Sequence, residues 1–294
     1  HSLKEGSEGN VIVIKLVNFS IMYNIYIYME KNEVRIFTYL PSPRIWKALI
    51  AADLTNIKLD IRADKPKNLS NRLWDFDAKP LKETLNTNKL FIKGTKGFSN
   101  TLAKTERFLT LNPFGNVPVA FNSKGTNGVF ESNSILRLVA RLGKKKINLY
   151  GENDYIKSRV DSFLDSSLVF GSVNQSYLLA LTSNKSIPQN TIKAGEVAYK
   201  SYMNGIETSL NLNKNNFLIS NDLTIADICF FGEFFQFAIY SSRKPRVKNK
   251  YWFDIIKKYK NDYKRAHKLL DKLLKISSFK KVAYNTLVKH NYYD

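Results

Sequence analysis

The sequence predicts a two-domain protein, with an α/β domain at about residues 32–143 followed by an all-α domain at 144–294. The first observation is an early pattern of alternating apolar residues, which is typical of strands and has no convincing counterpart after residue 143. The second is a series of long helical patterns in the second part. The third is the length of 294 residues, which is enough for two ordinary domains that each bury a core.

The α/β domain begins with a strand–helix–strand pattern. Residues 34–39 alternate as a strand does, and a break with two prolines at 41–43 precedes an Ala-rich helical run at 44–52. Residues 57–61 alternate again. Because such a unit normally forms a parallel pair of strands with the helix crossing over, we expect a thioredoxin-like arrangement.

The rest of this domain contains an insertion, a hairpin and a helix. Residues from about 64 to 107 show little periodicity and many Lys and Asn residues, which predicts a long polar insertion. Residues 117–122 and 129–131 have the pattern of two hairpin strands around a Gly-containing turn. Ser132 then stands as the N-cap of an amphipathic helix that Gly143 ends.

Helical patterns organise the second half of the chain. A basic linker precedes them, and the chain ends in a basic tail. The predicted helices lie at about 154–181, 192–212, 224–240, 250–259 and 266–288, the last in two pieces.

Residues 1–31 form an N-terminal extension, native or appended, which we leave out of the functional argument. Its apolar run at 11–28 is interrupted by Lys15, Asn18 and Asn24, and no small-residue cleavage site follows it. We therefore do not interpret it as a membrane span. A cleaved targeting peptide is the alternative.

The composition limits the chemistry that is available. Cys229 is the single cysteine and there are three histidines, which excludes a disulfide framework and any cysteine-based metal site. We predict no metal site, and a reducing compartment fits the cysteine content best.

The formal net charge of +21 suggests contact with nucleic acid or another polyanion, although an AT-rich genome also produces lysine-rich surfaces. Residues 243–294 hold sixteen Lys and Arg against four Asp and Glu. Aromatic residues between these charges suit stacking on RNA, or else they form the inner face of the last helices. They are Tyr251, Trp252, Phe253, Tyr259, Tyr263, Tyr284, Tyr292 and Tyr293.

Pro118 opens a predicted strand and is a candidate cis-proline. A cis bond would turn the backbone groups of Val117 outward, where they could pair with a peptide-like ligand as a short added strand. A plain turn from loop to strand is the alternative.

Glu131 and Ser132 lie where the second hairpin strand meets the next helix. The helix N-terminus and the Ser132 hydroxyl would attract a carboxylate, and Glu131 could hold an amine, which together suit the head group of an α-amino acid. A simple N-cap on a core helix is the alternative.

Two separate motifs resemble the glutathione S-transferase superfamily. The pattern Asn-Pro-x-Gly-x-Val-Pro at 112–118, followed by x-Glu-Ser-x-x-Ile ending at Ile135, is similar to the N-terminal domains of that superfamily. Residues 217–227 resemble its loop and capping box, in which Thr224 caps a helix and Asp227 reaches back. The resemblance covers most of the chain from Val34 to about Val288 and implies the two-domain transferase fold.

The resemblance also implies a glutathione site. Val117, Pro118, Glu131 and Ser132 would bind the tripeptide. Active members place a hydroxyl or thiol in the turn after the first strand, and here that turn offers Tyr39, Ser42 and Arg44. Because Ser42 lies between two prolines, unlike the active classes, we interpret the catalytic site as vestigial. Glutathione is a possible ligand, and no cofactor is required.

Within the superfamily, residues 38–39, 46–52, 133–135 and 139–142 most resemble the N-terminal part of the elongation factor 1-gamma family. That resemblance implies a cytoplasmic, non-catalytic assembly module of the translation elongation complex that binds the guanine-nucleotide exchange subunit. One alternative is an active glutathione transferase. Another is a module that joins an aminoacyl-tRNA synthetase complex or binds tRNA or the ribosome through the basic tail. A homodimer is a further possibility.

Overall fold

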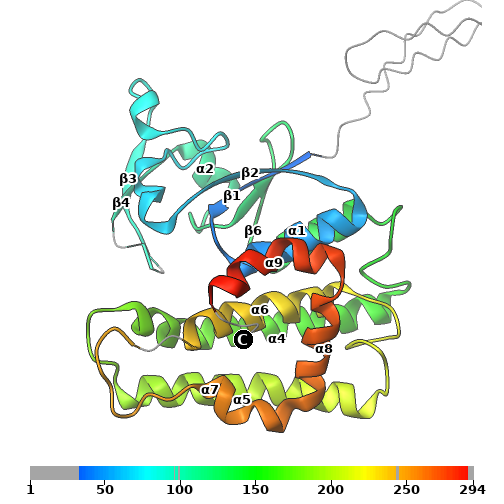
Figure 1. The fold of residues 1–294 in the computed structure, drawn as a ribbon. Helices are drawn as coiled ribbons and strands as arrows, with labels where there is room; N and C mark the ends of the chain where they lie inside the picture. Colours follow the sequence, from blue (N-terminus) through cyan, green and yellow to red (C-terminus); the bar gives the residue numbers. More distant parts are fainter. Residues whose placement is uncertain (1–32, 96, 99, 243–244, 291–294) are drawn as a thin grey trace, which may run out of the picture.

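The computed structural model describes residues 33–95, 97–98, 100–242 and 245–290, so the N-terminal extension lies outside it (Figure 1). Strand β1 (Glu33–Tyr39) pairs in parallel with β2 (Lys58–Asp64) and antiparallel with β5 (Val119–Phe121), which pairs with β6 (Gly128–Phe130). The strand order is β2-β1-β5-β6. The predicted strand–helix–strand unit and the predicted hairpin are both confirmed.

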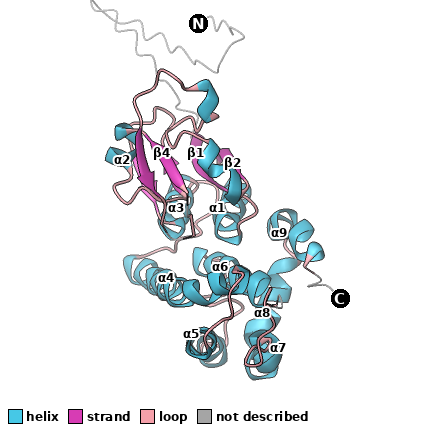
Figure 2. Cartoon of the chain, turned by 90° about the vertical axis from the view of Figure 1, so that its left-hand side faces the viewer, coloured by secondary structure: helices cyan, strands magenta, loops and turns pink. Residues whose placement is uncertain are grey.

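Helices α1 (Pro43–Thr55) and α3 (Ser132–Leu142) cover one face of this sheet (Figure 2). Pro43 suits the first turn of α1 because its missing N–H would have no partner there, and Asn56 ends the helix with a left-handed backbone at φ 58°. Ile36 and Ala120 of the sheet join this helical side of the core. The α/β part thus presents its two helices toward the rest of the chain.

The predicted polar insertion is a folded layer on the opposite face of the sheet. It contains two short 3₁₀ helices, an antiparallel hairpin and a following helix. Trp74 is 1% exposed; its ring meets the rings of Phe37, Phe98 and Phe108 edge-on, and its N–H donates to the Leu69 carbonyl at 3.0 Å. Periodicity could not predict this layer, because its apolar residues are spread over very short elements and the loops between them. Its elements are η1 (Pro66–Asn71), η2 (Leu81–Glu83), β3 (Leu90–Lys93), β4 (Thr101–Lys104) and α2 (Glu106–Leu111).

The second half is helical, as predicted, and is arranged around α6 (Ile225–Ser241). This helix packs against α1 and α4, and nearly all its side chains are buried. The predicted helix at 250–259 is shorter than expected because the Asp254 side chain accepts the Lys257 N–H and starts the helix only there. The remaining elements are α4 (Asp154–Thr182), α5 (Gln189–Leu212), α7 (Ile255–Tyr259), η3 (Lys260–Tyr263), α8 (Lys264–Leu274) and α9 (Ser277–Lys289).

The last described helix returns to the first. Figure 1 shows α9 beside α1, and the ring of Phe279 lies edge-on to Phe231 of α6, with centroids 4.9 Å apart. The Ser278 hydroxyl donates to Asp53 at 2.6 Å, and Lys281 forms an ion pair with the same carboxylate. The helical part therefore holds α1 from two sides, through α6 and through α9.

The predicted capping box at the start of α6 is confirmed. Thr224 caps the helix, and the buried Asp227 carboxylate accepts N–H groups from Thr224 and Leu218, both at 2.9 Å. Burial raises the pKa of Asp227 to about 6 despite these hydrogen bonds. The box fixes the loop before α6, and with it the position of the central helix.

His267 gives the fold a pH dependence that can be measured. Its ring packs edge-on against Phe234, its Nε2 atom has no hydrogen-bond partner, and burial lowers its pKa below 6.5. The unfolded chain therefore binds this proton more readily, so the stabilisation is complete above pH 6.5 and is lost as the pH falls below it. We expect His267→Gln to flatten the fall in the free energy of unfolding between pH 7 and 5.5.

Urea unfolding of both proteins at several pH values measures this difference. Asp227 acts in the opposite direction, because its raised pKa makes stability fall as the pH rises toward about 6. Its contribution is common to wild type and variant, so it cancels in the comparison. If the free energy of unfolding fell equally with pH in the wild type and the variant, His267 would not be a source of the pH dependence.

Candidate functional site

The turn after β1 holds the three residues that the sequence marks as candidate catalytic groups. Ser42 is 2% exposed and is the N-cap residue of α1, but its side chain makes no capping hydrogen bond. Tyr39 is half-buried, and its ring lies edge-on to Phe98 of the insertion, with centroids 6.2 Å apart. The structure encloses both hydroxyl-bearing residues among protein groups.

Arg44, the third of these residues, reaches across to the helical part. Its guanidinium donates to Glu233 Oε2 at 3.2 Å, to Gln175 Oε1 at 3.3 Å and to the Gly171 carbonyl at 3.4 Å. A Cβ atom at Gly171 would lie 2.8 Å from Arg44 Nη2, so a larger residue there would displace the guanidinium from this position. Burial alone would lower the pKa of Arg44, but Glu233 and the neighbouring Tyr39 and Glu131 raise it. Arg44 therefore connects the two parts of the molecule.

Lys47 lies at the centre of the same junction and is completely buried. Its Nζ donates to Glu233 Oε1 and to Asn133 Oδ1, both at 2.6 Å, and to Ser132 Oγ at 2.9 Å. These three acceptors come from α3 and α6, so one ammonium group joins three helices. We call Arg44, Lys47 and Glu233 the buried ion cluster.

The electrostatics of the buried ion cluster favour its charged state. Burial by itself would raise the pKa of Glu233, but the charges of Lys47 and Arg44 hold it below the ordinary value. Cys229 lies at the edge of the cluster, where its thiol donates to Asn133 Oδ1 at 3.2 Å and burial raises its pKa. That thiol is a poor nucleophile, because the thiolate is the reactive form.

The predicted glutathione-binding residues come together where β5 and β6 end. The Val117–Pro118 peptide bond is cis, as predicted, and so is Leu40–Pro41. Val119 pairs with Phe130, which places Val117 and Pro118 beside Glu131 and Ser132. Glu131 has φ 66°, a backbone conformation that non-glycine residues adopt mainly where the surroundings impose it. Its carboxylate accepts from Asn116 at 3.3 Å.

Ser132 differs from the expectation in two respects. The prediction that it is the N-cap of the helix is wrong, because Glu131 is the N-cap of α3 and Ser132 is its first residue. The Ser132 backbone lies at the N-terminus of α3, where the sequence predicts a site for a ligand carboxylate. Its hydroxyl oxygen, however, accepts a hydrogen bond from the Lys47 ammonium group. The residue is 8% exposed. The predicted ligand group is therefore also part of the packing around the buried ion cluster.

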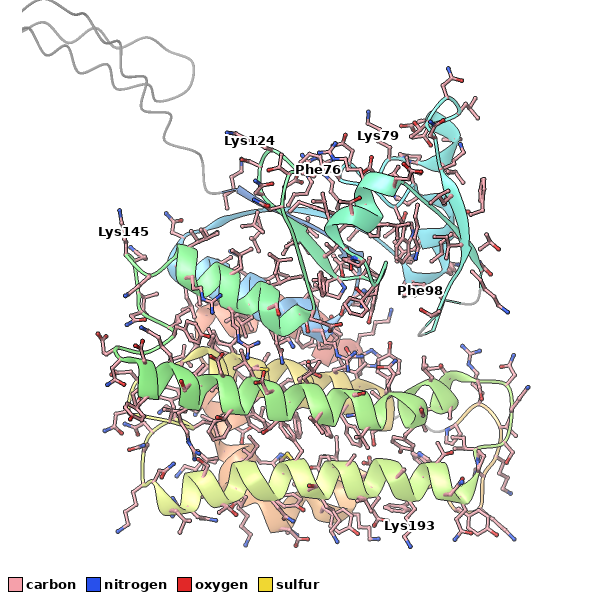
Figure 3. The ribbon with its side chains drawn as sticks, turned by 180° about the vertical axis from the view of Figure 1, so that it is seen from behind. Phe76, Lys79, Phe98, Lys124, Lys145 and Lys193 are labelled. Atoms are coloured by element: carbon pink, nitrogen blue, oxygen red, sulfur yellow. The ribbon has the colours of Figure 1, made fainter. Side chains whose placement is uncertain are left out.

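The loop of the inserted hairpin extends toward the helical part. A Cβ atom at Gly97 would lie 3.2 Å from Leu179 Cδ2 of α4, and Phe98 contacts both Tyr39 and Trp74. Figure 3 labels Phe98 at the end of the insertion that faces the helices. The loop thus links the turn after β1 to the C-terminal end of α4.

Sequence reasoning missed Lys47 and Glu233. The available signal was a lone glutamate inside the apolar run at 225–239, because a buried acid in such a helix needs a cation or hydrogen-bond donors as partners. No group of His, Cys, Asp and Glu side chains that could hold a metal ion occurs among the residues that the structure describes.

A cavity of about 570 Å³ lies elsewhere, between α4 and α5. Its wall includes Val169, Val173 and Val197, which are 63%, 52% and 56% exposed, together with Phe163 and Phe170. The sequence analysis did not predict this apolar groove. Three half-exposed valines on two neighbouring helices form a surface suited to a protein partner.

Of the six described aromatic residues that were expected to stack on RNA, four pack against the core. Tyr263 is 2% exposed, and the Tyr259 hydroxyl bonds to Glu196, so for these residues the alternative of an inner helical face is correct. Tyr251 and Tyr284 are 43% and 46% exposed. Tyr292 and Tyr293 lie outside the described residues. The exposed part of the tail is therefore mainly basic.

No known family model matches the chain. It is 26% identical to elongation factor 1-gamma 3 of Oryza sativa subsp. japonica over 234 residues, which are 75% of this chain and 47% of that protein. It is 25% identical to probable elongation factor 1-gamma 1 of Arabidopsis thaliana over 223 residues, 73% of this chain and 45% of that protein. The chain thus spans about half the length of the curated relatives it matches.

Solved transferase structures share the fold. A glutathione S-transferase-like protein from Lodderomyces elongisporus has a TM-score of 0.62 at 17% identity, over 85% of this chain and 94% of that one. Glutathione transferase F2 from Populus trichocarpa has a TM-score of 0.58 at 17% identity, over 86% of this chain and 98% of that one. The fold is that of the glutathione transferases, and the predicted resemblance to elongation factor 1-gamma is confirmed. None of the described helices is long and apolar enough to cross a membrane.

Proposed function

We infer that this chain is a transferase-like assembly module of the translation elongation factor 1 complex, which works in the cytoplasm by holding the guanine-nucleotide exchange subunit. The observation that carries this inference is that Arg44 belongs to the buried ion cluster and that the Ser132 hydroxyl is hydrogen-bonded to Lys47 of that cluster. Groups engaged in internal packing are poorly placed to stabilise a thiolate on a ligand. The sequence relatives agree, since they are elongation factor 1-gamma proteins.

The inserted layer supports a structural role for the same region. Phe98 contacts Tyr39, and its loop reaches Leu179 of α4, so protein groups occupy the approach to the turn after β1. Cys229 offers no replacement nucleophile, because its pKa is raised by burial. The region fits a scaffold better than a conjugating enzyme.

The apolar groove between α4 and α5 is the surface that we assign to the exchange subunit. A test is to mix this chain with the exchange subunit of the same organism and to measure binding by calorimetry. We expect the double variant Val169→Asp, Val173→Asp to weaken binding by at least about tenfold, because a carboxylate would be buried without a partner. Leu85→Asp is the matched control, since Leu85 is 80% exposed and lies on the insertion.

Absence of binding by the wild-type chain would contradict the proposed function. Equal weakening by the control variant would leave the function standing but remove the groove from it. Self-association measured by analytical ultracentrifugation, lost in the groove variant alone, would assign the groove to a second copy of the chain.

An active glutathione transferase is the second candidate, favoured by the cis Val117–Pro118 bond and by the backbone of Glu131. Conjugation of glutathione to an electrophilic chloronitrobenzene tests it. A saturable rate that falls in Glu131→Ala would establish the enzyme. A rate equal to the uncatalysed reaction, with no retention on glutathione resin, is the result we expect.

A further inference from the structure

The described part of the basic tail presents one continuous charged face. Every exposed residue of α8 is charged, and of these only Asp271 is acidic. Lys257 of α7 and Lys260 of η3 are exposed on the elements that precede α8, and Lys275 is exposed directly after its end. We call this surface the lysine face. Its basic members are Lys257, Lys260, Lys264, Arg265, Lys268, Lys272 and Lys275.

Most charges of the lysine face are not neutralised by the protein. Within the described residues, Lys260, Lys264, Lys268 and Lys275 have no carboxylate partner. Lys258 beside them is paired with Glu196 at 3.0 Å, so an ordinary surface ion pair does form where an acid is in reach. The other nearby acids are few: Asp262 and Asp271 lie on the surface, while Asp254 and Glu207 accept backbone N–H groups, the first from Lys257 and the second from Arg265 and Ala266.

The lysine face is held rigidly. The opposite side of α8 is buried through Leu269, Leu270, Leu273 and Leu274, so the helix cannot rotate its charges away. Within α8, Lys264, Lys268 and Lys272 follow one another at intervals of four residues, which corresponds to about 6 Å along the helix axis. A linear series of fixed positive charges matches a linear polyanion better than a compact one.

The side chains next to the lysines indicate which class of polyanion the lysine face can bind. An anionic membrane surface would favour apolar side chains beside the lysines, but the leucines of α8 all point inward. A single-stranded nucleic acid would use exposed aromatic platforms, but the two aromatic residues between Lys257 and Lys275, Tyr259 and Tyr263, are not exposed. The exposed Tyr251 and Tyr284 lie before and after this segment. What the face offers is point charges alone, which suit the phosphates of a duplex.

We propose that the lysine face binds the phosphate backbone of double-helical nucleic acid without reading its sequence. The binding is a second property of the molecule, independent of the assembly function and of the groove between α4 and α5. Because RNA and DNA duplexes present the same phosphate chemistry, both are expected to bind. Each phosphate contact releases condensed counterions, so the affinity should fall steeply with salt.

The test measures the affinity of the full chain for labelled 20-bp RNA and DNA duplexes by fluorescence anisotropy across a salt series. We expect log K to fall with log salt with a slope of about −3 to −5. The triple variant Lys260→Gln, Lys264→Gln, Lys268→Gln should bind at least about tenfold more weakly at 0.1 M salt, with a slope closer to zero by about 2–3.

The control variant removes the same charge from three other surfaces, at exposed residues that Figure 3 labels on the insertion, the linker and α5. The control variant should keep most of the wild-type affinity for the duplexes and the same slope of log K against log salt. Its substitutions are Lys79→Gln, Lys145→Gln and Lys193→Gln.

Equal weakening by the two triple variants would overturn the proposal, because net charge rather than the lysine face would then explain the binding. Tighter binding to a single strand of the same length would overturn the choice of a duplex. Stronger binding to phosphatidylserine vesicles than to either duplex would overturn the choice of nucleic acid. Equal binding of RNA and DNA duplexes supports a backbone contact, and circular dichroism of each variant confirms that it is folded.

Discussion

Glu233→Gln is expected to lower the free energy of unfolding by about 3–5 kcal/mol. The substitution keeps the shape of the side chain but removes the carboxylate that forms ion pairs with two cations, Lys47 at 2.6 Å and Arg44 at 3.2 Å. Lys47 is completely buried, so its charge would then lie in the protein without compensation. Breaking a buried pair costs more than the pair contributes in net stability, because one unpaired charge remains.

Urea unfolding at pH 7 measures this effect, and a second variant identifies its cause. Lys47→Met together with Glu233→Gln removes the buried charge that the single variant leaves, so we expect the double variant to recover part of the loss. Lys281→Met is the control, because it removes another ion pair between the helical part and α1, with the Lys281 side chain 70% exposed. It should change stability by no more than about 1 kcal/mol.

A loss from Glu233→Gln no larger than that from Lys281→Met would show that the cluster is hydrated rather than buried. The same measurement at lower pH gives a second check. The pKa of Glu233 is below its ordinary value in the folded chain, so its stabilisation is complete above the unfolded pKa of 4.5 and is lost as the pH falls below it. The variant should lack this part of the acid sensitivity.

Trp74→Ala is expected to destabilise the protein by about 3–5 kcal/mol. The indole is 1% exposed and packs against three aromatic rings, and its N–H bonds to the Leu69 carbonyl. Its removal would leave a cavity between the sheet and the insertion, and the carbonyl would lose its donor. Thermal and urea unfolding would show a lower midpoint.

Phe91→Ala is the matched control, since Phe91 belongs to the same insertion but is 64% exposed. Its effect should stay within about 0.5 kcal/mol. If the two substitutions had equally small effects, the inserted segment would be a loose loop, and its contacts with Phe37 of the sheet would contribute nothing to stability.

The features that the sequence predicted correctly are local ones. The capping box of Thr224 and Asp227 lies within four consecutive residues, and the candidate cis-proline could be identified from the residues next to Pro118. The strand–helix–strand unit likewise follows from short-range alternation and from the handedness of crossovers. Each of these features depends on a few neighbouring residues, so it can be predicted from one sequence alone.

The features that were missed depend on residues far apart in the chain. Lys47 and Glu233 are separated by 186 positions, and nothing near Lys47 indicates that an exposed-looking helical lysine is buried. The same holds for the insertion, where Trp74 finds its partners in Phe37, Phe98 and Phe108 through long-range packing. Periodicity measures one element at a time and cannot detect such pairs.

The return of α9 to α1 also bears on how the protein is made. The ribosome completes α1 at Thr55, but α9 begins only at Ser277. At translation rates of about 5–20 residues per second, this helix waits on the order of 10–45 s for its last neighbour. During that interval the surface of α1 that α9 will cover is open to chaperones and to other nascent chains, so its native packing is completed only once α9 has been made.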